Sequence, residues 1–583
     1  NAIISDFPDD EYKKATDKDR ILEGLEKARK WAFASSLIQG LCVLFSLVLS
    51  IITKGSLDTV GNNAMLFVIL NLALLLISCI AGIRTLQKGI QGFFRGTINS
   101  AGAVTFVVLA VLIEELVAVF LSSSGTPELS LYTGAASLSL FTASLVRLWS
   151  LKRAKGNFDF VTGGTQLYAS DLVKDEEDSF EIGRGLLITD PAIAYSAKVK
   201  KPRRFVENSF ADDPADADVQ KPTLVVLGIS LVAAVVFGIL RSSALVGLNT
   251  FTALLAVGIP CFVTMASNIG LYTVDKAFSK KGSAILGHRA VEESAEMNAY
   301  AIDSTEIFPK ETISIIGIKT FHNMRIDDAI LYSAALAIAA ENPLSGVFEN
   351  TILGKRDLLP PVETLAYEER LGLSAWIHGR RVLFGNRDLL INHNVDVPGE
   401  DFETQYTHNG RKVSYLAIAG KIAAMFVIQY RADRKMRIAL RNADRAGITL
   451  LIRNTDCNIT EDMICHYYRL PPDTVKLLNP VSGALFRKYQ GEEKIIADSG
   501  LIHNGTVEAA FRTVYEARRL YDGSFTNRIM AVVYSALALL LGIVLTATGG
   551  VVTLTDYVVI AVQVLFSVIA VGFPWLQSRH VNR

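Results

Sequence analysis

The hydrophobic residues of this chain gather into long apolar segments that are separated by polar stretches of very unequal length. Each apolar segment is long enough to cross about 30 Å of hydrocarbon as a helix. We therefore predict eight transmembrane helices in groups of four, two and two. They lie near residues 31–53, 64–83, 101–122 and 129–150, then near 222–240 and 246–273, and finally near 528–547 and 554–577.

Two long polar insertions interrupt the apolar pattern, at residues 151–221 and 274–525. Both contain short alternating or apolar runs bounded by turn residues, which are typical of folded β-rich or α/β domains. Lysine and arginine gather at 27–30, 84–95 and 152–155, whereas the intervening loops carry few of them. The positive-inside rule then predicts that both termini and both insertions lie on the cytoplasmic side of the cell (plasma) membrane.

Composition narrows the class of protein further. The 583 residues are 50% hydrophobic and carry a formal net charge of zero, which fits a polytopic membrane protein and gives no basis for nucleic-acid binding. The five cysteines form no paired motif, so we expect no disulfide framework. Residues 1–30 are charged throughout, which predicts a cytoplasmic segment rather than a secretory signal. The first residue is Asn1 and not methionine, so we leave open whether the N-terminus is truncated.

The candidate chemistry begins in the stretch from Thr250 to Pro309. Its apolar helix is interrupted by Pro260, and Cys261 follows directly. A proline inside a membrane helix removes one backbone hydrogen bond and frees carbonyl groups, and freed carbonyls beside a thiol could hold a cation. Further along, a buried-strand pattern at 299–302 ends on Asp303.

These residues resemble two motifs of the P-type ATPases. Ile259 to Cys261 stands where the heavy-metal-transporting (CPx-type) branch has C-P-C, and Asp303 to Ile307 stands where the family has D-K-T-G-T, whose aspartate is phosphorylated by ATP. The spacing between the motifs and the grouping of the apolar segments also match. The resemblance implies a multi-domain polytopic α-helical membrane protein with eight transmembrane helices and a small β-rich actuator-like domain. It further implies an α/β HAD-like phosphorylation domain that carries an inserted α+β nucleotide-type domain.

The same resemblance implies the domain boundaries. The expected order is a cytoplasmic N-terminal segment (1–30), transmembrane helices 1–4 (31–150), a reduced actuator-like domain (151–221), transmembrane helices 5–6 (222–273), a phosphorylation-like domain in two pieces (274–321 and 431–525) that flank a nucleotide-binding-like domain (322–430), and transmembrane helices 7–8 with a C-terminal tail (526–583). The actuator-like segment is shorter than the family leads us to expect, and the family's T-G-E motif has no clear counterpart in it.

Two stretches of the nucleotide-type region resemble the family's nucleotide-binding elements. AENPLSGVFENTIL resembles S-E-H-P-L-A-x-A-I, with Asn342 in place of the histidine and Pro343 retained. ERLGLSAWIHGRRVLFGNRDLL resembles a glycine-containing strand pair with its following turn, in which Gly372, Gly385 and Asn386 keep their positions. The resemblance assigns these residues to nucleotide binding.

The phosphorylation motifs are carried by residues that are far apart in the sequence. Thr305 follows Asp303 in the same loop, and a turn at 454–456 resembles T-G-D, so that Asp456 retains its aspartate. PDTVKLL places Lys476 at the position of the phosphate-contacting lysine. Asp498 is the aspartate that remains from G-D-G-x-N-D, whose carboxylates hold magnesium in the family.

The chain departs from the family at the residues that carry the chemistry. Ser304, Glu306 and Ile307 replace the lysine, the glycine and the second threonine after Asp303. A carboxylate at Glu306 repels a phosphate at a cost of about a few kcal/mol at intermediate dielectric. Phosphoryl transfer needs a nucleophile, Mg²⁺ and cations around the developing charge. Because several of these are changed together, we interpret Asp303 as a vestigial phosphorylation site, with ATP and Mg²⁺ binding weak or lost and no tightly bound cofactor.

The candidate transport site also has fewer metal ligands than the family pattern. Cys261, after Pro260, supplies one thiol where a soft metal prefers two or three sulfur or imidazole donors. Glu114 and Glu115 lie inside the third apolar segment, and intramembrane carboxylates are candidates for proton or cation binding. Because adjacent residues on a helix point about 100° apart, we expect at most one of the two glutamates to face the bundle interior.

We interpret the chain as a P-type ATPase-like integral membrane protein that is a pseudo-pump, acting as a regulatory or scaffolding component with a protein partner in the bilayer. One alternative is an active, divergent heavy-metal cation transporter that is phosphorylated at Asp303. The other is a membrane sensor that binds ATP without hydrolysing it. The sequence leaves enzymatic activity undecided, and the degenerate motifs weigh against it.

Overall fold

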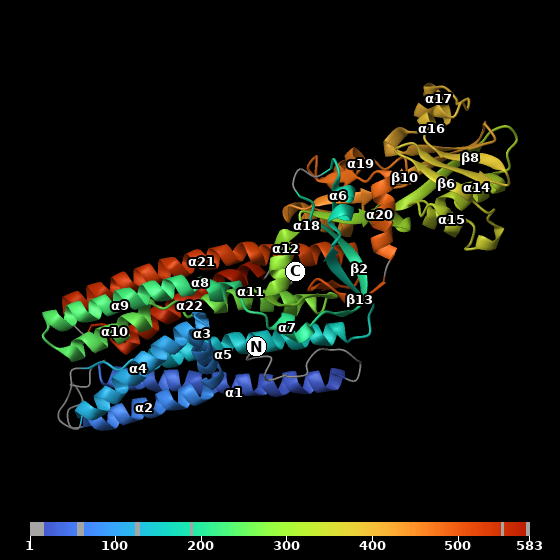
Figure 1. Cartoon of the computed structure of the whole chain (residues 1–583). Coiled ribbons are helices and arrows are strands. Elements are labelled where there is room, and N and C mark those ends of the chain that lie inside the picture. Colours follow the sequence, from blue (N-terminus) through green and yellow to red (C-terminus); the bar gives the residue numbers. More distant parts are fainter. Residues whose placement is uncertain are drawn as a thin grey trace. The chain divides into compact units, whose positions relative to one another are not determined.

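The computed structural model describes residues 17–54, 63–122, 129–186, 190–491, 493–549 and 553–578 (Figure 1). The chain divides into two compact units. The helix-bundle unit comprises Asn1–Thr165, Arg204–Glu292 and Glu516–Arg583, and the β-sheet unit comprises Gln166–Arg203 and Glu293–Tyr515. Of the expected N-terminal segment 1–30, residues 1–16 lie outside the described residues, as do the last residues of the expected C-terminal tail, 579–583.

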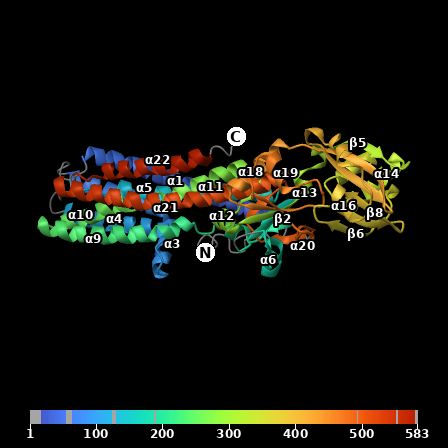
Figure 2. The ribbon, with the colours of Figure 1, turned by 90° about the horizontal axis from the view of Figure 1, so that it is seen from above.

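Long helices dominate the helix-bundle unit (Figure 2). The longer helices that lie wholly or partly in this unit are α1 (Asp17–Ile52), α2 (Ala64–Ala81), α3 (Ile83–Phe94), α4 (Ser100–Ser122), α5 (Thr133–Val161), α9 (Gln220–Leu240), α10 (Ala244–Gly258), α11 (Val263–Phe278), α12 (Gly287–Glu296), α21 (Val507–Gly549) and α22 (Asp556–Ser578). Shorter elements between them are α7 (Phe205–Ser209), α8 (Pro214–Asp218) and β3 (Ser283–Ile285).

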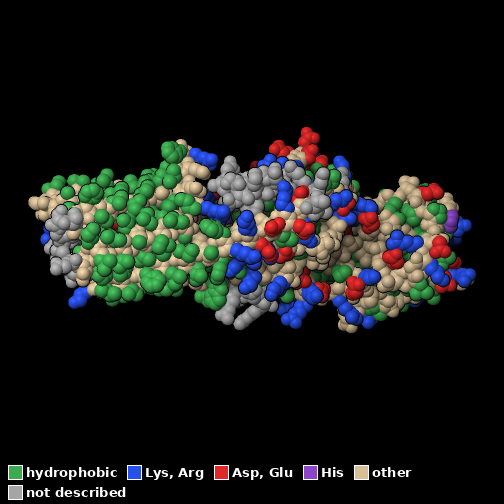
Figure 3. Space-filling view, turned by 90° about the horizontal axis from the view of Figure 1, so that it is seen from below, with side chains coloured by type: hydrophobic (Ala, Val, Ile, Leu, Met, Phe, Trp, Pro, Cys, Tyr) green, Lys and Arg blue, Asp and Glu red, His purple; other side chains and the backbone are tan. Residues whose placement is uncertain are grey.

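Eight of the described segments are long and apolar enough to cross a membrane, which confirms the predicted number and order of transmembrane helices. Hydrophobic side chains cover the face of the helix bundle that Figure 3 shows, and Phe45, Val232 and Leu540 are among the exposed apolar residues of the bundle. Large apolar side chains on the outside of a helix bundle are expected where lipid is the solvent. The chain is therefore a membrane protein whose outer helical surface faces a bilayer.

The interior of the bundle is built around α4 and α5. Helix α5 packs against α1, α4 and α11, and α4 also packs against α2 and α10. The residues at their contacts are partly small, including Ala103, Ala135 and Ala253, and all three are buried. Small side chains let membrane helices approach closely, so dispersion contacts can hold the bundle together.

The first sheet of the β-sheet unit carries Asp303 at the end of a central strand. Its strands run in the order β12-β11-β4-β2-β1-β14, and β13 also pairs with β2. Strands β12, β11, β4 and β2 are parallel, whereas β1 is antiparallel to both β2 and β14. The strands are β1 (Leu167–Leu172), β2 (Ile193–Pro202), β4 (Ala299–Asp303), β11 (Thr449–Arg453), β12 (Val475–Leu477), β13 (Glu493–Ala497) and β14 (Leu501–His503). The helices around this sheet are α6 (Glu176–Gly183), α13 (Ser304–Ile307), α18 (Arg434–Arg445), α19 (Glu461–Tyr468) and α20 (Pro480–Gly491).

The segment expected to form an actuator-like domain supplies two strands of this same sheet. Strand β2 pairs directly with β4 from Ile193 to Tyr195, and β1 lies on the other side of β2. Residues 166–203 of the expected range belong to the β-sheet unit, whereas 151–165 and 204–221 belong to the helix-bundle unit. The structure therefore differs from a separate 151–221 domain, because hydrogen bonding of β2 to β4 joins this segment to the strand of Asp303.

The second sheet of the β-sheet unit is antiparallel, with the strand order β5-β10-β9-β8-β7-β6. Its strands are β5 (Ile313–Thr320), β6 (Glu363–Glu368), β7 (Gly372–Ile377), β8 (Arg380–Gly385), β9 (Lys412–Ile418) and β10 (Lys421–Tyr430). Its helices are α14 (Ile326–Ala339), α15 (Ser345–Thr351), α16 (Arg387–Asn392) and α17 (Glu400–Thr404), with single 3₁₀ turns η3 (Lys310–Thr312), η4 (Arg356–Leu358) and η5 (His408–Gly410). Strand β5 pairs with β10 and so belongs to this sheet, although its residues precede the expected range 322–430. The sheet therefore starts earlier in the chain than we expected.

Candidate functional site

Asp303 ends the buried strand β4 and caps the short helix α13, as the strand pattern predicts. Its Oδ1 accepts hydrogen bonds from the Thr305 backbone N–H at 2.8 Å and from the Thr305 hydroxyl at 2.7 Å. An aspartate that bonds to donors of the following turn is a regular N-cap. Thr305 therefore lies beside Asp303 and holds one oxygen of its carboxylate.

The other oxygen of Asp303 forms an ion pair with Arg453. Arg453 is the last residue of β11, and the parallel register of β11 and β4 places it directly opposite Asp303. The same guanidinium group lies 3.9 Å from Glu341, which also pairs with Arg487. Both oxygens of the Asp303 carboxylate thus have partners within the chain, and the second partner is a cation.

Glu306 lies next to this pair on α13. Burial, together with the neighbouring Asp303 carboxylate, raises the pKa of Glu306 to about 8. Its Oε1 accepts a hydrogen bond of 2.9 Å from the side-chain amide of Gln490 on α20. The glutamate that replaces the family's glycine is therefore neutral for much of the physiological pH range, and a neutral carboxyl repels a phosphate less than a carboxylate does.

Asp456 is buried in a hydrogen-bond network of its own. It accepts a hydrogen bond of 2.5 Å from the Tyr430 hydroxyl and one of 3.0 Å from the Asn458 backbone N–H. Burial raises the pKa of this carboxyl above its ordinary value. Asn454 donates to the Asp456 backbone carbonyl at 2.7 Å, so the turn is fixed by its own side chains.

Lys476 has a local partner at the edge of the sheet. It lies on β12 and pairs with Asp473 at 2.7 Å, three residues earlier in the chain. The hydrogen bond to Asp473 raises the pKa of the Lys476 ammonium group. The partner that the structure gives this lysine is therefore Asp473 and not Asp303.

Asp498 follows β13, which pairs with β2 and not with β4. Its carboxylate lies 2.8 Å from Lys174, 3.7 Å from Arg203 and 3.6 Å from Lys494. These three cations are different residues from the partners of Asp303. The structure therefore brings Thr305 to Asp303, and gives Asp456, Lys476 and Asp498 separate surroundings.

Asn342 and Pro343 are buried in the β-sheet unit. The Asn342 amide donates to the Thr455 carbonyl at 2.6 Å and accepts from the Leu344 backbone N–H at 2.9 Å. The side chain that takes the place of the family's histidine thus connects the 340–345 turn to the turn before Asp456.

Gly372 and Gly385 face each other across β7 and β8. A Cβ atom on Gly385 would lie 2.2 Å from the Leu371 carbonyl oxygen and 2.9 Å from the Gly372 Cα. Gly372 also has a φ of +142°, which favours glycine. Asn386 caps α16 by accepting from the Leu389 N–H at 3.0 Å. These residues allow a close strand approach and a tight turn, which explains their types without a ligand.

In the helix-bundle unit, the break after α10 lies where the sequence predicts it. Helix α10 ends at Gly258 and α11 begins at Val263, with Pro260 and Cys261 between them. The Cys261 thiol donates to the Ser139 hydroxyl at 3.3 Å. Two backbone carbonyls of the last turn of α10 are bonded to other helices, Val257 by Tyr534 at 2.6 Å and Ala256 by Gln563 at 2.7 Å.

Glu114 and Glu115 are both fully buried, so the expectation that at most one faces the interior is wrong. The reason is that α4 is packed on several sides, by α2, α5 and α10. Glu114 accepts a hydrogen bond of 2.5 Å from the Asn249 amide on α10. Glu115 accepts one from the Thr133 hydroxyl at the start of α5. Each glutamate thus bonds to a different neighbouring helix.

Asp556 is a further buried carboxylate of the helix-bundle unit. It caps the start of α5, accepting from the backbone N–H groups of Gly134 at 3.1 Å and Ala135 at 3.0 Å. Ser46 on α1 also donates to it, at 3.4 Å. The sequence signal for Asp556 is a charged residue at the start of an apolar segment.

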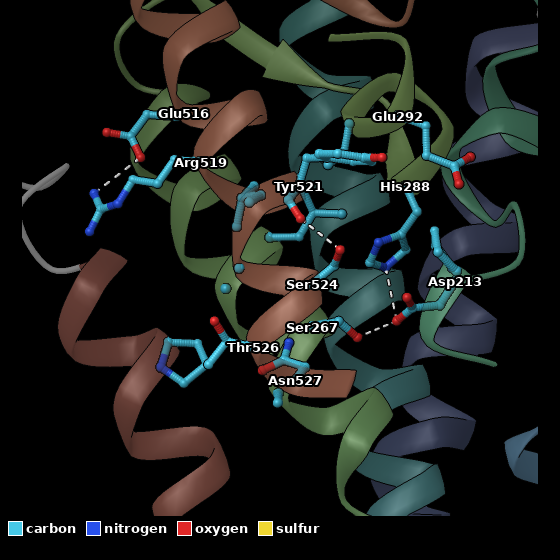
Figure 4. Close-up of a pocket in the computed structure, with 18 of the residues that line it drawn as sticks. Asp213, Ser267, His288, Glu292, Glu516, Arg519, Tyr521, Ser524, Thr526 and Asn527 are labelled. Atoms are coloured by element: carbon cyan, nitrogen blue, oxygen red, sulfur yellow. Dashed lines mark hydrogen bonds and ion pairs between the residues drawn. The ribbon is translucent and has the colours of Figure 1, made fainter. Parts of the chain in front are cut away.

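A small cavity of about 50 Å³ lies between α11, α12 and α21 in the helix-bundle unit (Figure 4). His288 and Ser267 both point toward the Asp213 carboxylate, with the His288 ring nitrogen 3.4 Å away. Burial, and then the nearby Arg153 charge, lowers the pKa of His288 to about 3. His288 is therefore a buried neutral group.

Curated relatives of the chain include metal-transporting ATPases. Copper-transporting ATPase 2 of Rhizobium meliloti is 21% identical over 213 residues, which are 36% of this chain and 26% of that protein. A copper-exporting P-type ATPase of Staphylococcus saprophyticus is 20% identical over 250 residues, which are 42% of this chain and 31% of that protein. The chain resembles heavy-metal P-type ATPases. The matched regions span only about a quarter to a third of the length of these relatives.

Solved structures of heavy-metal P-type ATPases also match. One crystal structure of a zinc-transporting PIB-type ATPase has a TM-score of 0.45 at 12% identity, covering 89% of this chain and all (100%) of that one. A second crystal structure of a zinc-transporting PIB-type ATPase, in a different state, has a TM-score of 0.44 at 13% identity, covering 94% of this chain and 100% of that one. No family model matches the chain.

Arg453 is the residue that motif comparison with heavy-metal P-type ATPases missed. It precedes the 454–456 turn and belongs to none of the expected motifs. The sequence indicates a buried strand at 299–302 and a polar turn at 454–456 directly after Arg453, and the structure forms β4 and β11 at these two places. Their common register, which the sequence does not contain, decides that Arg453 meets Asp303.

Proposed function

We propose that this chain is a P-type ATPase-like membrane protein that does not turn over ATP and acts as a regulatory or scaffolding component. The observation that carries the proposal is the engagement of both Asp303 oxygens, one by Thr305 and the other by Arg453. A carboxylate attacks phosphorus through a free lone pair in line with the leaving group. An oxygen paired with a guanidinium group is a poor nucleophile, because the cation stabilises the negative charge that attack would have to transfer to phosphorus.

The surroundings of Asp303 support weak or lost binding of Mg²⁺. A divalent cation at this carboxylate would lie next to the Arg453 guanidinium group and meet a like charge. Asp498, the aspartate retained from the magnesium motif, is instead paired with Lys174, Arg203 and Lys494. The donor set around Asp303 does not fit the ion, and no catalytic step is assigned to it.

ATP binding is also proposed to be weak or lost, with no tightly bound cofactor. Both ends of the Asn342 side chain are already hydrogen-bonded within the chain. Gly372 and Gly385 are required by the close approach of β7 to β8. The residues that the family resemblance assigns to nucleotide binding therefore have internal roles, which also weakens the alternative of an ATP-binding sensor.

We propose that the protein lies in the plasma membrane with both termini and both insertions on the cytoplasmic side, because lysine and arginine concentrate on the loops of that side. A P-type ATPase-like protein that does not turn over ATP would act by binding other proteins, so we further propose a protein partner in the membrane. No nucleic-acid partner is proposed, since the net charge is zero.

The buried polar groups of the bundle favour a second candidate, a divergent heavy-metal cation transporter phosphorylated at Asp303. Glu114, Glu115 and Asp556 are intramembrane carboxylates, and Cys261 lies at a helix break. Such groups are expensive in a membrane and commonly mark ion pathways. The first candidate is preferred because each of these carboxylates accepts hydrogen bonds from neighbouring helices and so has a structural role.

The two candidates are separated by ATP hydrolysis in nanodiscs across Cu⁺, Zn²⁺ and other heavy-metal ions, with the Asp303→Asn variant as the control. We expect the wild type and the variant to hydrolyse ATP at the same background rate with every ion. Metal-stimulated hydrolysis in the wild type that is absent from Asp303→Asn would establish the transporter instead.

A further inference from the structure

A cavity of about 250 Å³ opens into the helix-bundle unit beside the helix break. It is lined by residues of α3, α4, α5 and α11 and by the 209–216 segment, and it reaches Cys261. Asp212 lines it with an exposed side chain, whereas Cys261 is half-buried. The cavity therefore extends from solvent toward the interrupted helix.

The ammonium group of Lys88 occupies the acidic part of this cavity. Its Nζ lies 2.8 Å from Asp212 and 3.5 Å from Asp216. Burial disfavours the charged form of Lys88, but the Asp216 and Asp212 carboxylates outweigh it and raise the pKa of Lys88 above its ordinary value. The lysine is therefore a charged cation that the chain itself places between two carboxylates.

The fold of α3 holds Lys88 in this position. The next residue, Gly89, packs against α4 so closely that a Cβ atom would lie 2.6 Å from the Ala101 carbonyl oxygen. Asp216 is fixed from the other side, because Ser100 at the start of α4 donates to it through its hydroxyl and, at 3.4 Å, its backbone N–H. Both partners of the ion pair are thus positioned by α4, and the pair is built into the packing.

The oxygen atoms around the Lys88 ammonium are those that a divalent cation prefers. Asp212 and Asp216 supply carboxylates, and Asp213, which also lines the cavity, accepts from Asn268 at 3.0 Å. Carboxylate oxygens suit hard or borderline ions such as Mn²⁺. A divalent ion entering the cavity would have to displace Lys88 or lie beside its positive charge.

We propose that Lys88 is a resident counter-cation that keeps divalent metal ions out of this cavity, and that neutralising it creates a cation site at Asp212 and Asp216. The inference does not depend on whether Asp303 is phosphorylated, since it concerns the access of ions to the bundle alone. Lys88 is thereby the cation that pairs directly with Asp212 and Asp216, in a cavity that Arg84, Arg147 and Arg153 also line.

The test is Mn²⁺ binding to the purified full-length chain in nanodiscs, followed by the loss of the free-ion electron paramagnetic resonance signal. Lys88→Met removes the charge and keeps the apolar stem, Lys88→Gln is a second neutral variant, and Lys88→Arg is the matched control that keeps the charge. We expect both neutral variants to bind Mn²⁺ at least about tenfold more tightly than the wild type and Lys88→Arg.

The gain in affinity should disappear when Asp212→Asn or Asp216→Asn is added to Lys88→Met. Equal Mn²⁺ affinity in the wild type and in either folded neutral variant would overturn the proposal. So would a gain that survives both aspartate substitutions, because the ion would then be bound elsewhere. Tight, stoichiometric Mn²⁺ binding by the wild type that Asp212→Asn abolishes would overturn it as well.

Discussion

Arg453 and Asp303 form a buried ion pair across the neighbouring parallel strands β11 and β4. The two residues are 150 positions apart in the sequence, and the strand register brings them directly opposite each other. The guanidinium side chain is 10% exposed and the carboxylate side chain is 6% exposed. The residue expected to receive a phosphoryl group is thus already paired with a cation of the chain.

Replacing Arg453 with methionine should destabilise the sheet, because it leaves the Asp303 carboxylate buried without its cation. Removing one partner of a buried pair costs about 3–5 kcal/mol. Hydrogen exchange of the β4 and β11 amides measures the free energy of local opening. The double variant Arg453→Met with Asp303→Asn should recover much of the loss, since no charge is then left alone.

The matched control for this pair is Arg325→Met. Arg325 is exposed and lies 3.7 Å from the exposed Asp327, so its removal should change the opening free energy by less than about 1 kcal/mol. If Arg453→Met behaves like Arg325→Met, the ion pair is not important for the sheet.

Glu306 should make the β-sheet unit less stable as pH rises. Its pKa is about 8 in the folded chain, so the unfolded chain releases this proton at lower pH than the folded chain does. Stability should therefore fall between about pH 5 and about pH 8, by up to about 1.4 kcal/mol per pH unit. Glu306→Gln should flatten this dependence in hydrogen exchange of β4, whereas the exposed Glu311→Gln should retain it.

His288 should have the opposite effect on the helix-bundle unit. Its pKa is about 3 because of burial and the Arg153 charge, so the unfolded chain binds a proton that the folded chain does not. Stability should be lost as pH falls from about 6 toward about 3, again by up to about 1.4 kcal/mol per pH unit. His288→Asn should reduce the acid sensitivity of the thermal midpoint, and the exposed His378→Asn should not.

Gly385→Ala should destabilise the second sheet. The new Cβ would lie 2.2 Å from the Leu371 carbonyl oxygen, which forces the strands apart at a cost of about 1–3 kcal/mol. Gly399→Ala is the control, because nothing lies within 4 Å of a Cβ at that position. Equal thermal midpoints for the two variants would show that the close approach of β7 and β8 can relax.

The larger features of the fold could be predicted from the sequence because they follow from hydropathy and local backbone chemistry. The eight spans come from apolar length, and the break between α10 and α11 comes from Pro260. The strand ending at Asp303 comes from a short buried run followed by a polar turn. Each of these sequence signals lies within a few residues of the helix, helix break or strand that it predicts.

The candidate site could not be predicted to the same extent, because its contacts join distant segments. The insertion of β2 beside β4 depends on strand pairing, and the Arg453–Asp303 contact depends on register. The burial of both Glu114 and Glu115 depends on how many helices surround α4. Motif comparison could place Asp498 in a family pattern, but not its actual partners Lys174 and Lys494.

Phosphoenzyme formation from γ-labelled ATP in the purified chain tests directly whether Asp303 is phosphorylated, with Asp303→Asn as the control. We predict no acid-stable label above the Asp303→Asn background, across heavy-metal ions and from about pH 5 to about pH 8. A hydroxylamine-labile label that is present in the wild type and absent from Asp303→Asn would contradict it, because Asp303 would then be a working nucleophile.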